Sequence, residues 1–309
     1  MRNTLARSGK SCGNLNDLGL LSDINQTRRI GAMKSKGFCG KFKISIIIMG
    51  IFILMVGLIT YDGINGTVRS MTSKLEVWQD PTTGYKWLYR VTDDGIELVK
   101  DVRYDDCSLA PVLSGDVAIP PYIDNQKVKR IGAEVFAGCV RLETIKIPAG
   151  VVEIGGVDTW TSFAGCRMLT NIVVEADNAT YKSVDGVLYD KALETLILCP
   201  PGKVNVSIPS GVKVIGTFAF GQCRNIKSLV IPQSVTRIGG FAFFGCFSLR
   251  SVCFCGDAPV CECSDGGIYD FTSDELKTYA RKDTRGWNKG AENHLQIPEQ
   301  WNGRRIIFE

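Results

Sequence analysis

The side chains in this sequence that could do chemistry are, above all, its twelve cysteines. The closest spacing is in Cys253-Phe-Cys255 and Cys261-Glu-Cys263. Zinc sites usually place two to four residues between paired cysteines, and alternate strand residues share one face with little room, so this spacing favours disulfides over a metal site. Disulfides among Cys253, Cys255, Cys261 and Cys263 are the first interpretation, and free thiols or a metal site are the alternatives. Export from the cytoplasm would favour disulfides.

Other reactive groups are few. His294 is the only histidine, and it lies in a polar segment where a solvated side chain is expected. Asp93-Asp94 and Asp105-Asp106 are paired carboxylates, but adjacent residues of a turn or strand rarely converge on one substrate. Neither a phosphate-binding glycine loop nor an H-E-x-x-H metal motif occurs. We therefore predict that the protein is not an enzyme and uses no cofactor.

Four further cysteines belong to a repeated sequence, and the strands and turns of that repeat must position the other side chains. Two adjacent copies run from Ile208 to Phe254, and a fixed period of this length is typical of leucine-rich solenoids. Four pairs of landmarks are each 23 residues apart: Pro209 and Pro232, Ile215 and Ile238, Phe220 and Phe243, Cys223 and Cys246. Cys139, Cys166, Cys223 and Cys246 share one repeat position, which predicts buried, small hydrophobic side chains.

The repeat, Val-Thr-x-Ile-Gly-x-x-Ala-Phe-x-Gly-Cys-x-x-Leu-x-x-Ile-x-Ile-Pro, resembles the BspA-type leucine-rich repeats of surface proteins from bacteria and some protozoa. Val235–Cys246 with Ser248-Leu249 is the best match, and the resemblance covers roughly residues 85–309. It implies a β-rich, right-handed solenoid with a role in adhesion or protein binding, and it brings no catalytic residues. Departures from the pattern are four inserted residues around Val157–Thr161 and the cysteine pairs after Phe254.

The predicted fold is mainly β, a right-handed leucine-rich-repeat solenoid of about 23-residue repeats, with a β-hairpin N-cap and a C-terminal cap, preceded by one transmembrane helix. Asp93-Asp94-Gly95 between two apolar runs predicts the N-terminal hairpin, and Asp185-Gly186 predicts another in an enlarged repeat unit. We divide the chain into a disordered basic segment 1–43, a transmembrane helix or signal anchor 44–60, a stalk 61–84, an N-terminal cap 85–127, repeats 128–256 with the enlarged hairpin unit 175–202, and a C-terminal cap 257–309.

Residues 44–60 are 17 consecutive residues without a charge, which predicts a membrane-spanning segment in contact with the lipid bilayer. We expect an uncleaved anchor, with a cleaved signal as the alternative. Residues 1–43 carry nine Lys or Arg and two Asp, so the positive-inside rule predicts a single-pass protein with a cytoplasmic N-terminus and an extracytoplasmic repeat domain at the cell surface.

The rest of the chain carries 27 basic and 30 acidic residues, which gives no electrostatic case for nucleic-acid binding. The Asn-x-Ser/Thr sequons at Asn65, Asn178 and Asn205 would matter only in a eukaryotic secretory pathway.

The expected contact surface is the solvent-facing side of the repeat strands, between the residues that build the core. The resulting hypothesis is protein–protein binding or adhesion to an unidentified protein or glycan on another cell or matrix. The alternative is a structural or assembly protein of the cell envelope that binds no host ligand. The predicted contact residues are Glu143, Thr144, Lys146, Thr170, Asn171, Lys227, Ser228, Arg250 and Ser251.

Overall fold

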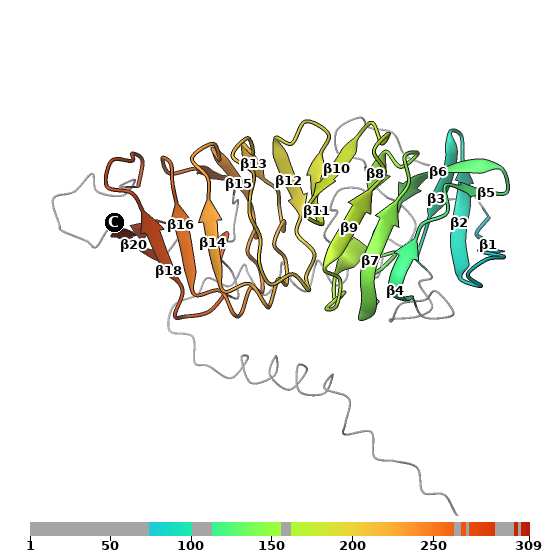
Figure 1. Ribbon diagram of the computed structural model, residues 1–309, viewed down its shortest axis with the longest axis horizontal. Helices are drawn as coiled ribbons and strands as arrows, with labels where there is room; N and C mark the ends of the chain where they lie inside the picture. The colour runs from blue at the N-terminus through green and yellow to red at the C-terminus, as the bar shows by residue number, and fades with distance from the viewer. Residues whose placement is uncertain are drawn as a thin grey trace, which may run out of the picture. The chain divides into compact units, whose positions relative to one another are not determined.

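A computed structural model gives the fold, and it describes residues 74–100, 113–155, 162–262, 267–269, 272–287, 300–301 and 304–309. The predicted basic segment, membrane segment and most of the predicted stalk lie outside these ranges. All described residues belong to one compact unit, Thr72–Glu309. It is built from strands and turns that stack as the coils of a leucine-rich-repeat solenoid, shown in Figure 1.

Most coils contribute strands to two sides of the solenoid. One side carries two parallel sheets, which we call the strand face. The first of them consists of β4 (Ser114–Ala118), β7 (Arg141–Ile147) and β9 (Asn171–Val174). The second consists of β14 (Ser228–Ile231), β16 (Ser251–Phe254), β18 (Lys277–Ala280) and β20 (Arg304–Phe308), with β19 (Gln300–Trp301) antiparallel at its end.

The other side carries the remaining strands in two further sheets. One contains β1 (Glu76–Gln79), β2 (Lys86–Thr92), β3 (Gly95–Leu98), β5 (Tyr122–Ile123), β6 (Gln126–Ile131) and β8 (Glu153–Ile154). The other contains β10 (Tyr181–Val184), β11 (Val187–Asp190), β12 (Thr195–Leu198), β13 (Val214–Ile215), β15 (Arg237–Gly239) and β17 (Val260–Glu262). Because β6 pairs with β8, and β13 with β15, one strand per coil extends each sheet.

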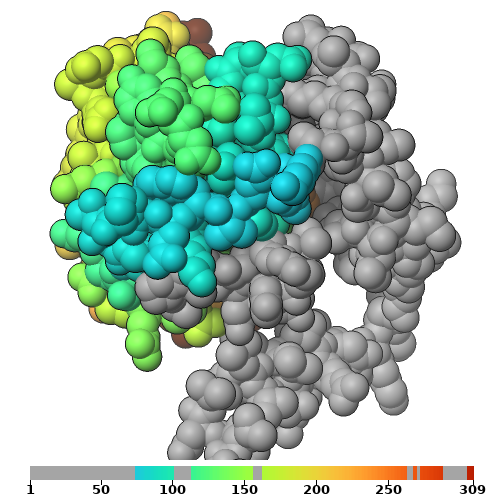
Figure 2. All heavy atoms as spheres, turned by 90° about the vertical axis from the view of Figure 1, so that its right-hand side faces the viewer, coloured from blue at the N-terminus to red at the C-terminus, as the bar shows by residue number. Residues whose placement is uncertain are grey.

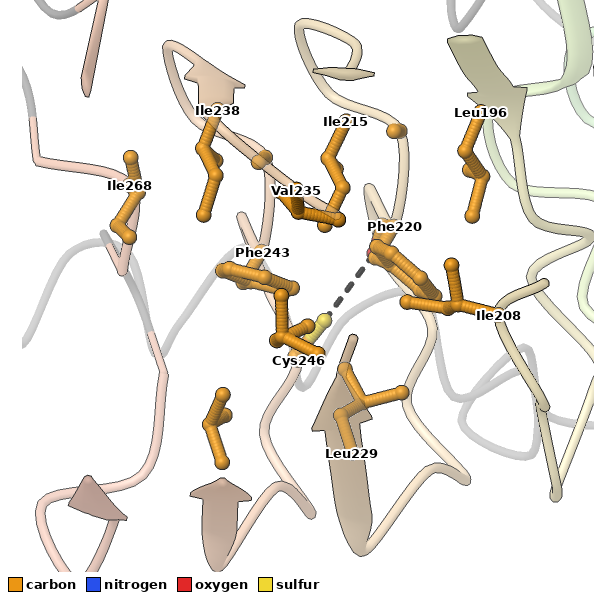
Figure 3. Close-up of a cluster of buried hydrophobic side chains, with 14 of the residues drawn as sticks. Leu196, Ile208, Ile215, Phe220, Leu229, Val235, Ile238, Phe243, Cys246 and Ile268 are labelled. Atoms are coloured by element: carbon orange, nitrogen blue, oxygen red, sulfur yellow. Dashed lines mark hydrogen bonds between the residues drawn. The ribbon is translucent and has the colours of Figure 1, made fainter. Parts of the chain in front are cut away.

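The core repeats with the sequence. Phe220 and Phe243 stack with ring centroids 5.4 Å apart, and Tyr269 continues the stack from Phe243 at the same distance. Figure 3 shows the apolar side chains of neighbouring coils pointing inward around these rings. Each coil alone would expose this layer, so the stacked neighbours provide the burial that stabilises it.

The repeat cysteines are more than small hydrophobic side chains. The thiols of Cys166 and Cys246 donate to the carbonyls of Phe136 and Phe220 in the preceding coil, at 3.0 and 3.1 Å. Cys223 is buried as well, as predicted. Burial raises the pKa of the Cys166 thiol to about 12, which keeps it protonated as a donor. Cys139 is buried, as predicted, but it is disulfide-bonded and so differs from the small hydrophobic side chain predicted at this repeat position.

The N-terminal cap is the predicted hairpin with one more strand. β2 and β3 pair antiparallel, and β1 pairs with β2, so the predicted stalk 61–84 contains a strand of the cap. β3 then pairs in parallel with β6, which joins the hairpin to the first coil. Seen from this end of the unit, the hairpin strands lie in front of the later coils (Figure 2).

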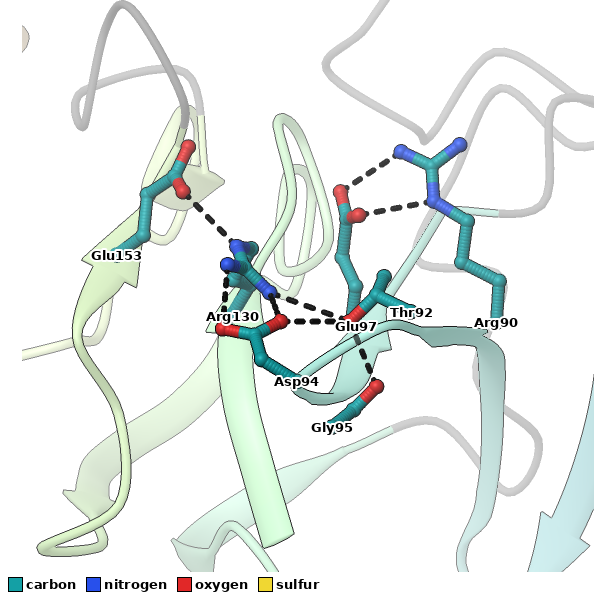
Figure 4. Close-up of polar contacts among 7 residues, drawn as sticks. All are labelled: Arg90, Thr92, Asp94, Gly95, Glu97, Arg130 and Glu153. Carbon is teal, nitrogen blue, oxygen red and sulfur yellow. Dashed lines mark hydrogen bonds and ion pairs between the residues drawn. The ribbon is translucent and has the colours of Figure 1, made fainter. Parts of the chain in front are cut away.

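Ion pairs fix this cap to the repeats. Arg130 of β6 binds both oxygens of Asp94 in the hairpin turn and one oxygen of Glu153 in the next coil, whereas Arg90 makes two hydrogen bonds of 2.8 Å to Glu97 within the hairpin itself. Figure 4 shows these side chains reaching across β2, β3, β6 and β8. The hydrogen bonds from Arg130 are the main cause that lowers the pKa of Asp94 to about 2.

In the C-terminal region, parallel strands continue to stack beyond residue 256, where the sequence repeat was predicted to end. β18 and β20 continue the parallel sheet of β16, and the equivalent inward positions are Val252, Thr278 and Ile306. Their separations are 278 − 252 = 26 and 306 − 278 = 28 residues, compared with 252 − 229 = 23 for the preceding pair. The coils therefore continue, but longer turns destroy the sequence period that revealed the others.

A candidate binding surface on the parallel strands

The solvent-facing side chains of the strand face are positioned by alternation along the strands, interrupted in β7 by a register shift at Glu143. In β7, Leu142, Ile145 and Ile147 are buried, whereas Glu143 and Lys146 between them are exposed. Side chains of a strand alternate between its faces, so the residues that build the core also orient their neighbours outward. The parallel register aligns Thr144 with Asn171, which places outward residues of successive coils side by side.

The same logic holds in the second sheet. Leu229 and Ile231 of β14 are buried, and Ser228 is exposed. The register aligns Ser228 with Ser251 and Ser251 with Lys277. Lys227 and Arg250 precede these strands in adjacent coils, joined by a hydrogen bond of 2.8 Å from the Arg250 amide to the Lys227 carbonyl. All nine predicted contact residues are exposed or half-buried on the strand face.

These nine residues do not form one continuous sheet surface. Glu143, Thr144, Lys146, Thr170 and Asn171 belong to the first sheet and its edge, and Lys227, Ser228, Arg250 and Ser251 to the second. The enlarged repeat unit comes between them. The Gly202 amide bonds to the Leu169 carbonyl, and the Asn225 side chain bonds to the Gly202 carbonyl, so an irregular coil separates β9 from β14.

The predicted hairpin of this unit lies directly against β9. β10 and β11 pair antiparallel around Asp185 and Gly186, both with positive φ, as a two-residue turn requires. The Ile172 amide of β9 donates to the Gly186 carbonyl at 2.9 Å. The hairpin therefore borders the first patch at Asn171 and helps to divide the strand face in two.

The cysteine pairs are placed differently from each other. Cys253 lies in β16, Cys255 directly follows that strand, and Cys261 lies in β17 on the other side of the solenoid. These three are half-buried thiols, and Cys263 lies outside the described residues, so a disulfide involving it stays a prediction. Burial is the largest cause that raises the pKa of Cys253, and the adjacent Cys255 adds to it. Among the described residues, no group of three or more His, Cys, Asp or Glu side chains could hold a metal ion.

The sequons have very different environments. Asn178 is fully buried, and its amide nitrogen donates to the carbonyls of Pro148 and Val151 at 3.1 and 2.8 Å. Asn205 is exposed. Asn65 lies outside the described residues, as do His294 and Asp105-Asp106. Asp94 is used in the ion pair with Arg130, so the Asp93-Asp94 pair is part of the cap.

Sequence reasoning missed several outward residues of the last coils. Lys277 and Arg305 extend the row that Ser228 and Ser251 begin, because β18 and β20 continue their sheet. Arg224 and Phe247 form a cation–π contact of 5.3 Å beside the same sheet. In the sequence, the apolar residues Leu276, Ala280 and Ile306, which are buried, indicate these strands, although the 23-residue period is lost after Phe254.

No helix among the described residues is long and apolar enough to cross a membrane, and residues 44–60 lie outside them.

Comparisons with known proteins agree with this architecture. Residues 121–197 and 203–261 match the family model described as BspA type leucine rich repeat region, in six copies. No curated protein sequence matches the chain.

Several solved structures of bacterial proteins are similar to this chain at low identity. A leucine-rich repeat protein from Eubacterium ventriosum is 21% identical, with a TM-score of 0.39 over 54% of this chain and 48% of that one. The pneumococcal vaccine antigen PcpA is 18% identical, with a TM-score of 0.40 over 61% of each chain. A leucine rich cell surface protein from Faecalibacterium prausnitzii is 17% identical, with a TM-score of 0.32 over 77% of this chain and 96% of that one. The chain thus spans about half of the first of these proteins and less than two thirds of the second.

Proposed function

Since this chain is a leucine-rich-repeat protein of the BspA type, we propose that it binds a protein or glycan on another cell or matrix through its strand face. The observation that carries this proposal is the arrangement of the outward side chains. Nine polar residues predicted from the repeat are exposed or half-buried there, on strands whose inward residues form the core. A rigid sheet that presents polar groups in register is suited to recognition, because little order is lost on binding.

The chemistry of this surface favours binding over catalysis. It combines cations such as Lys146 and Lys227 with hydroxyl groups such as Thr144 and Ser228 and the amide of Asn171. These groups donate and accept hydrogen bonds but include no activated nucleophile or general base. Protein surfaces and glycans both offer complementary partners for such a set.

The proposed location follows from the N-terminal sequence. Residues 44–60 would anchor the protein in the lipid bilayer as a single span, with the basic segment 1–43 in the cytoplasm and the solenoid outside. This topology would present the strand face to extracellular ligands.

The test uses beads coated with the full chain and a panel of immobilised matrix proteins and glycans. Lys146→Ala, Asn171→Ala and Lys227→Ala should each weaken adhesion to a panel member that binds the wild type. Matched controls are Lys127→Ala and Lys182→Ala, which change exposed residues of β6 and β10, outside the two parallel sheets of the strand face. The proposal fails if none of the three strand-face variants loses adhesion, or if the controls lose as much.

The rival function is a structural or assembly role in the cell envelope. It predicts that the wild-type chain adheres to no panel member and instead self-associates as its concentration rises. Analytical ultracentrifugation of the full chain over a hundredfold concentration range separates the two.

A further inference from the structure

A row of cations lies along the starting ends of four consecutive strands of the second sheet. Lys227 and Arg250 directly precede β14 and β16, Lys277 begins β18, and Arg305 is the second residue of β20. All four side chains are exposed. We call this row the basic edge; Figure 1 shows its four strands side by side.

The strand register brings these cations close together. The Arg250 amide bonds to the Lys227 carbonyl, and the Lys277 amide bonds to the Arg250 carbonyl at 2.9 Å. Thr278 pairs with Ile306, so Lys277 and Arg305 are also neighbours. Adjacent strands are about 4.8 Å apart, so the four cations span roughly 14 Å with one cation for each strand.

Carboxylates of the chain neutralise little of this charge. Arg250 pairs with Glu275 at 3.0 Å, but both side chains are exposed, at 49% and 78%, so water and salt weaken the pair. Lys227, Lys277 and Arg305 form no ion pair with any residue that the structure describes. Asp274 is another exposed acid next to Glu275. Because the basic edge has four cations and only these two acids beside it, its net charge is positive.

An aromatic side chain adjoins the basic edge. The Phe247 ring is 49% exposed and carries the Arg224 guanidinium 5.3 Å from its centroid. Arg224 Nε is buried and has no hydrogen-bond partner among the described residues. Arg250 in turn donates to the backbone carbonyl of Phe247 at 3.0 Å, which places Phe247 next to the basic edge.

We propose that the basic edge, with Arg224 and Phe247, binds a linear polysaccharide that carries sulfate or carboxylate groups. This inference rests on the proposed binding function of the strand face and names the class of ligand for its C-terminal half. The cations, one for each strand at two adjacent register positions, match a polymer with repeated anionic groups. Phe247 offers an apolar ring to the face of a sugar, and Ser228 and Ser251 offer hydroxyl groups in the same register row as Lys277 and Arg305.

An acidic polypeptide is the competing ligand of the same charge. It could satisfy the cations, but it would not need the exposed ring of Phe247, because acidic side chains present no flat apolar face. Phe247 therefore distinguishes the two ligand classes.

The experiment measures binding of the full chain to three immobilised probes: heparin, polyglutamate and neutral dextran. The test variant is Lys227→Gln/Lys277→Gln/Arg305→Gln, and the matched control is Lys86→Gln/Lys127→Gln/Lys182→Gln, three exposed lysines away from the second sheet. We expect heparin to bind, and the test variant to lose about tenfold in affinity at low salt, since each exposed ion pair contributes a factor of about two to five. The control variant should bind as the wild type does, and Phe247→Ala should weaken heparin binding further in either background.

Four outcomes overturn the proposal. These are no binding to heparin, equal loss in the control variant, binding to dextran that matches heparin, and heparin binding that is no tighter than polyglutamate binding and is insensitive to Phe247→Ala. A protein that fails the heparin test but still adheres to a matrix protein in a manner sensitive to Lys146→Ala would retain the proposed function. Failure of both assays would remove both proposals.

Discussion

At the scale of single residues, Asn178 shows how a buried polar side chain organises the repeat core. Its amide nitrogen donates to two carbonyls, and its oxygen accepts from the amides of Thr180 and Tyr181 at 2.9 and 2.7 Å. All four bonds join the turn after β9 to the preceding coil or to the start of β10. The sequence alone marks Asn178 only as a glycosylation sequon, because its burial depends on the coil stacked above it.

We predict that Asn178→Ala lowers the free energy of unfolding by about 2–4 kcal/mol, because it leaves several buried backbone groups without partners. Asn205→Ala, at the exposed sequon, should change it by less than about 0.5 kcal/mol. Urea denaturation followed by circular dichroism measures both. Equal losses in the two variants would contradict the assigned role of Asn178.

The ion pair between Asp94 and Arg130 predicts acid sensitivity of the N-terminal cap. The pKa of Asp94 is lowered to about 2 from an ordinary 3.8, so its contribution to stability is complete above about pH 4 and is lost as the pH falls towards 2. Asp94 is half exposed, at 51% of its side chain, so solvent screening limits the contribution to under about 1 kcal/mol.

Asp94→Asn should therefore lower stability at pH 6 and have little effect at pH 2. Amide hydrogen exchange of β2 and β3 at the two pH values, corrected for intrinsic exchange rates, reports the cap directly. Faster exchange in the variant that was equal at both pH values would indicate a role for Asp94 other than the ion pair.

At the scale of elements, the hairpin of the enlarged unit depends on close contact with β9. A Cβ atom at Gly186 would lie 2.5 Å from Asn171 Oδ1, and Gly186 has a φ of +72°. Gly211 has open space around it. These two glycines therefore separate the effect of hairpin docking from that of losing a glycine.

Gly186→Ala should cost about 1–2 kcal/mol of unfolding free energy, from strain at positive φ together with displacement of Asn171. Gly211→Ala should be neutral or slightly stabilising, because it reduces the freedom of the unfolded chain. Thermal denaturation of both variants tests this. A hairpin that docked loosely would tolerate Gly186→Ala as well as Gly211→Ala.

The sequence predicted the regular elements well and the irregular ones poorly. The 23-residue period predicts the coils from β6 to β16, and Asp93-Asp94-Gly95 and Asp185-Gly186 predict both hairpins, because turn chemistry is local. The sequence assigned the segments of β18 and β20 to a C-terminal cap and not to further coils, because their longer turns hide the period. It also treated the strand face as one surface, since the position of the enlarged unit between β9 and β14 depends on tertiary contacts such as that of Gly202 with Leu169.

At the scale of the whole molecule, the proposed topology predicts protease sensitivity from outside. Cells expressing the full chain with a C-terminal tag should lose the tag when protease is added to intact cells, because residues after 60 would lie outside the cytoplasmic membrane. A cytoplasmic marker protein serves as the control. A tag protected until the cell envelope is opened would place the solenoid between membranes or in a lumen. Protection until the cytoplasmic membrane is broken would reverse the topology and remove the case for disulfides.

The measurement that tests the central claim most directly is site-specific photo-crosslinking on cells that display the full chain. A photoreactive amino acid replaces Glu143 or Ser228 on the two patches of the strand face, or Lys127 or Lys182 elsewhere; all four residues are exposed. The account predicts crosslinks to a matrix protein or glycan from Glu143, Ser228 or both, and none from the two control positions. Crosslinks only from Lys127 and Lys182, or equally from all four positions, would contradict binding through the strand face.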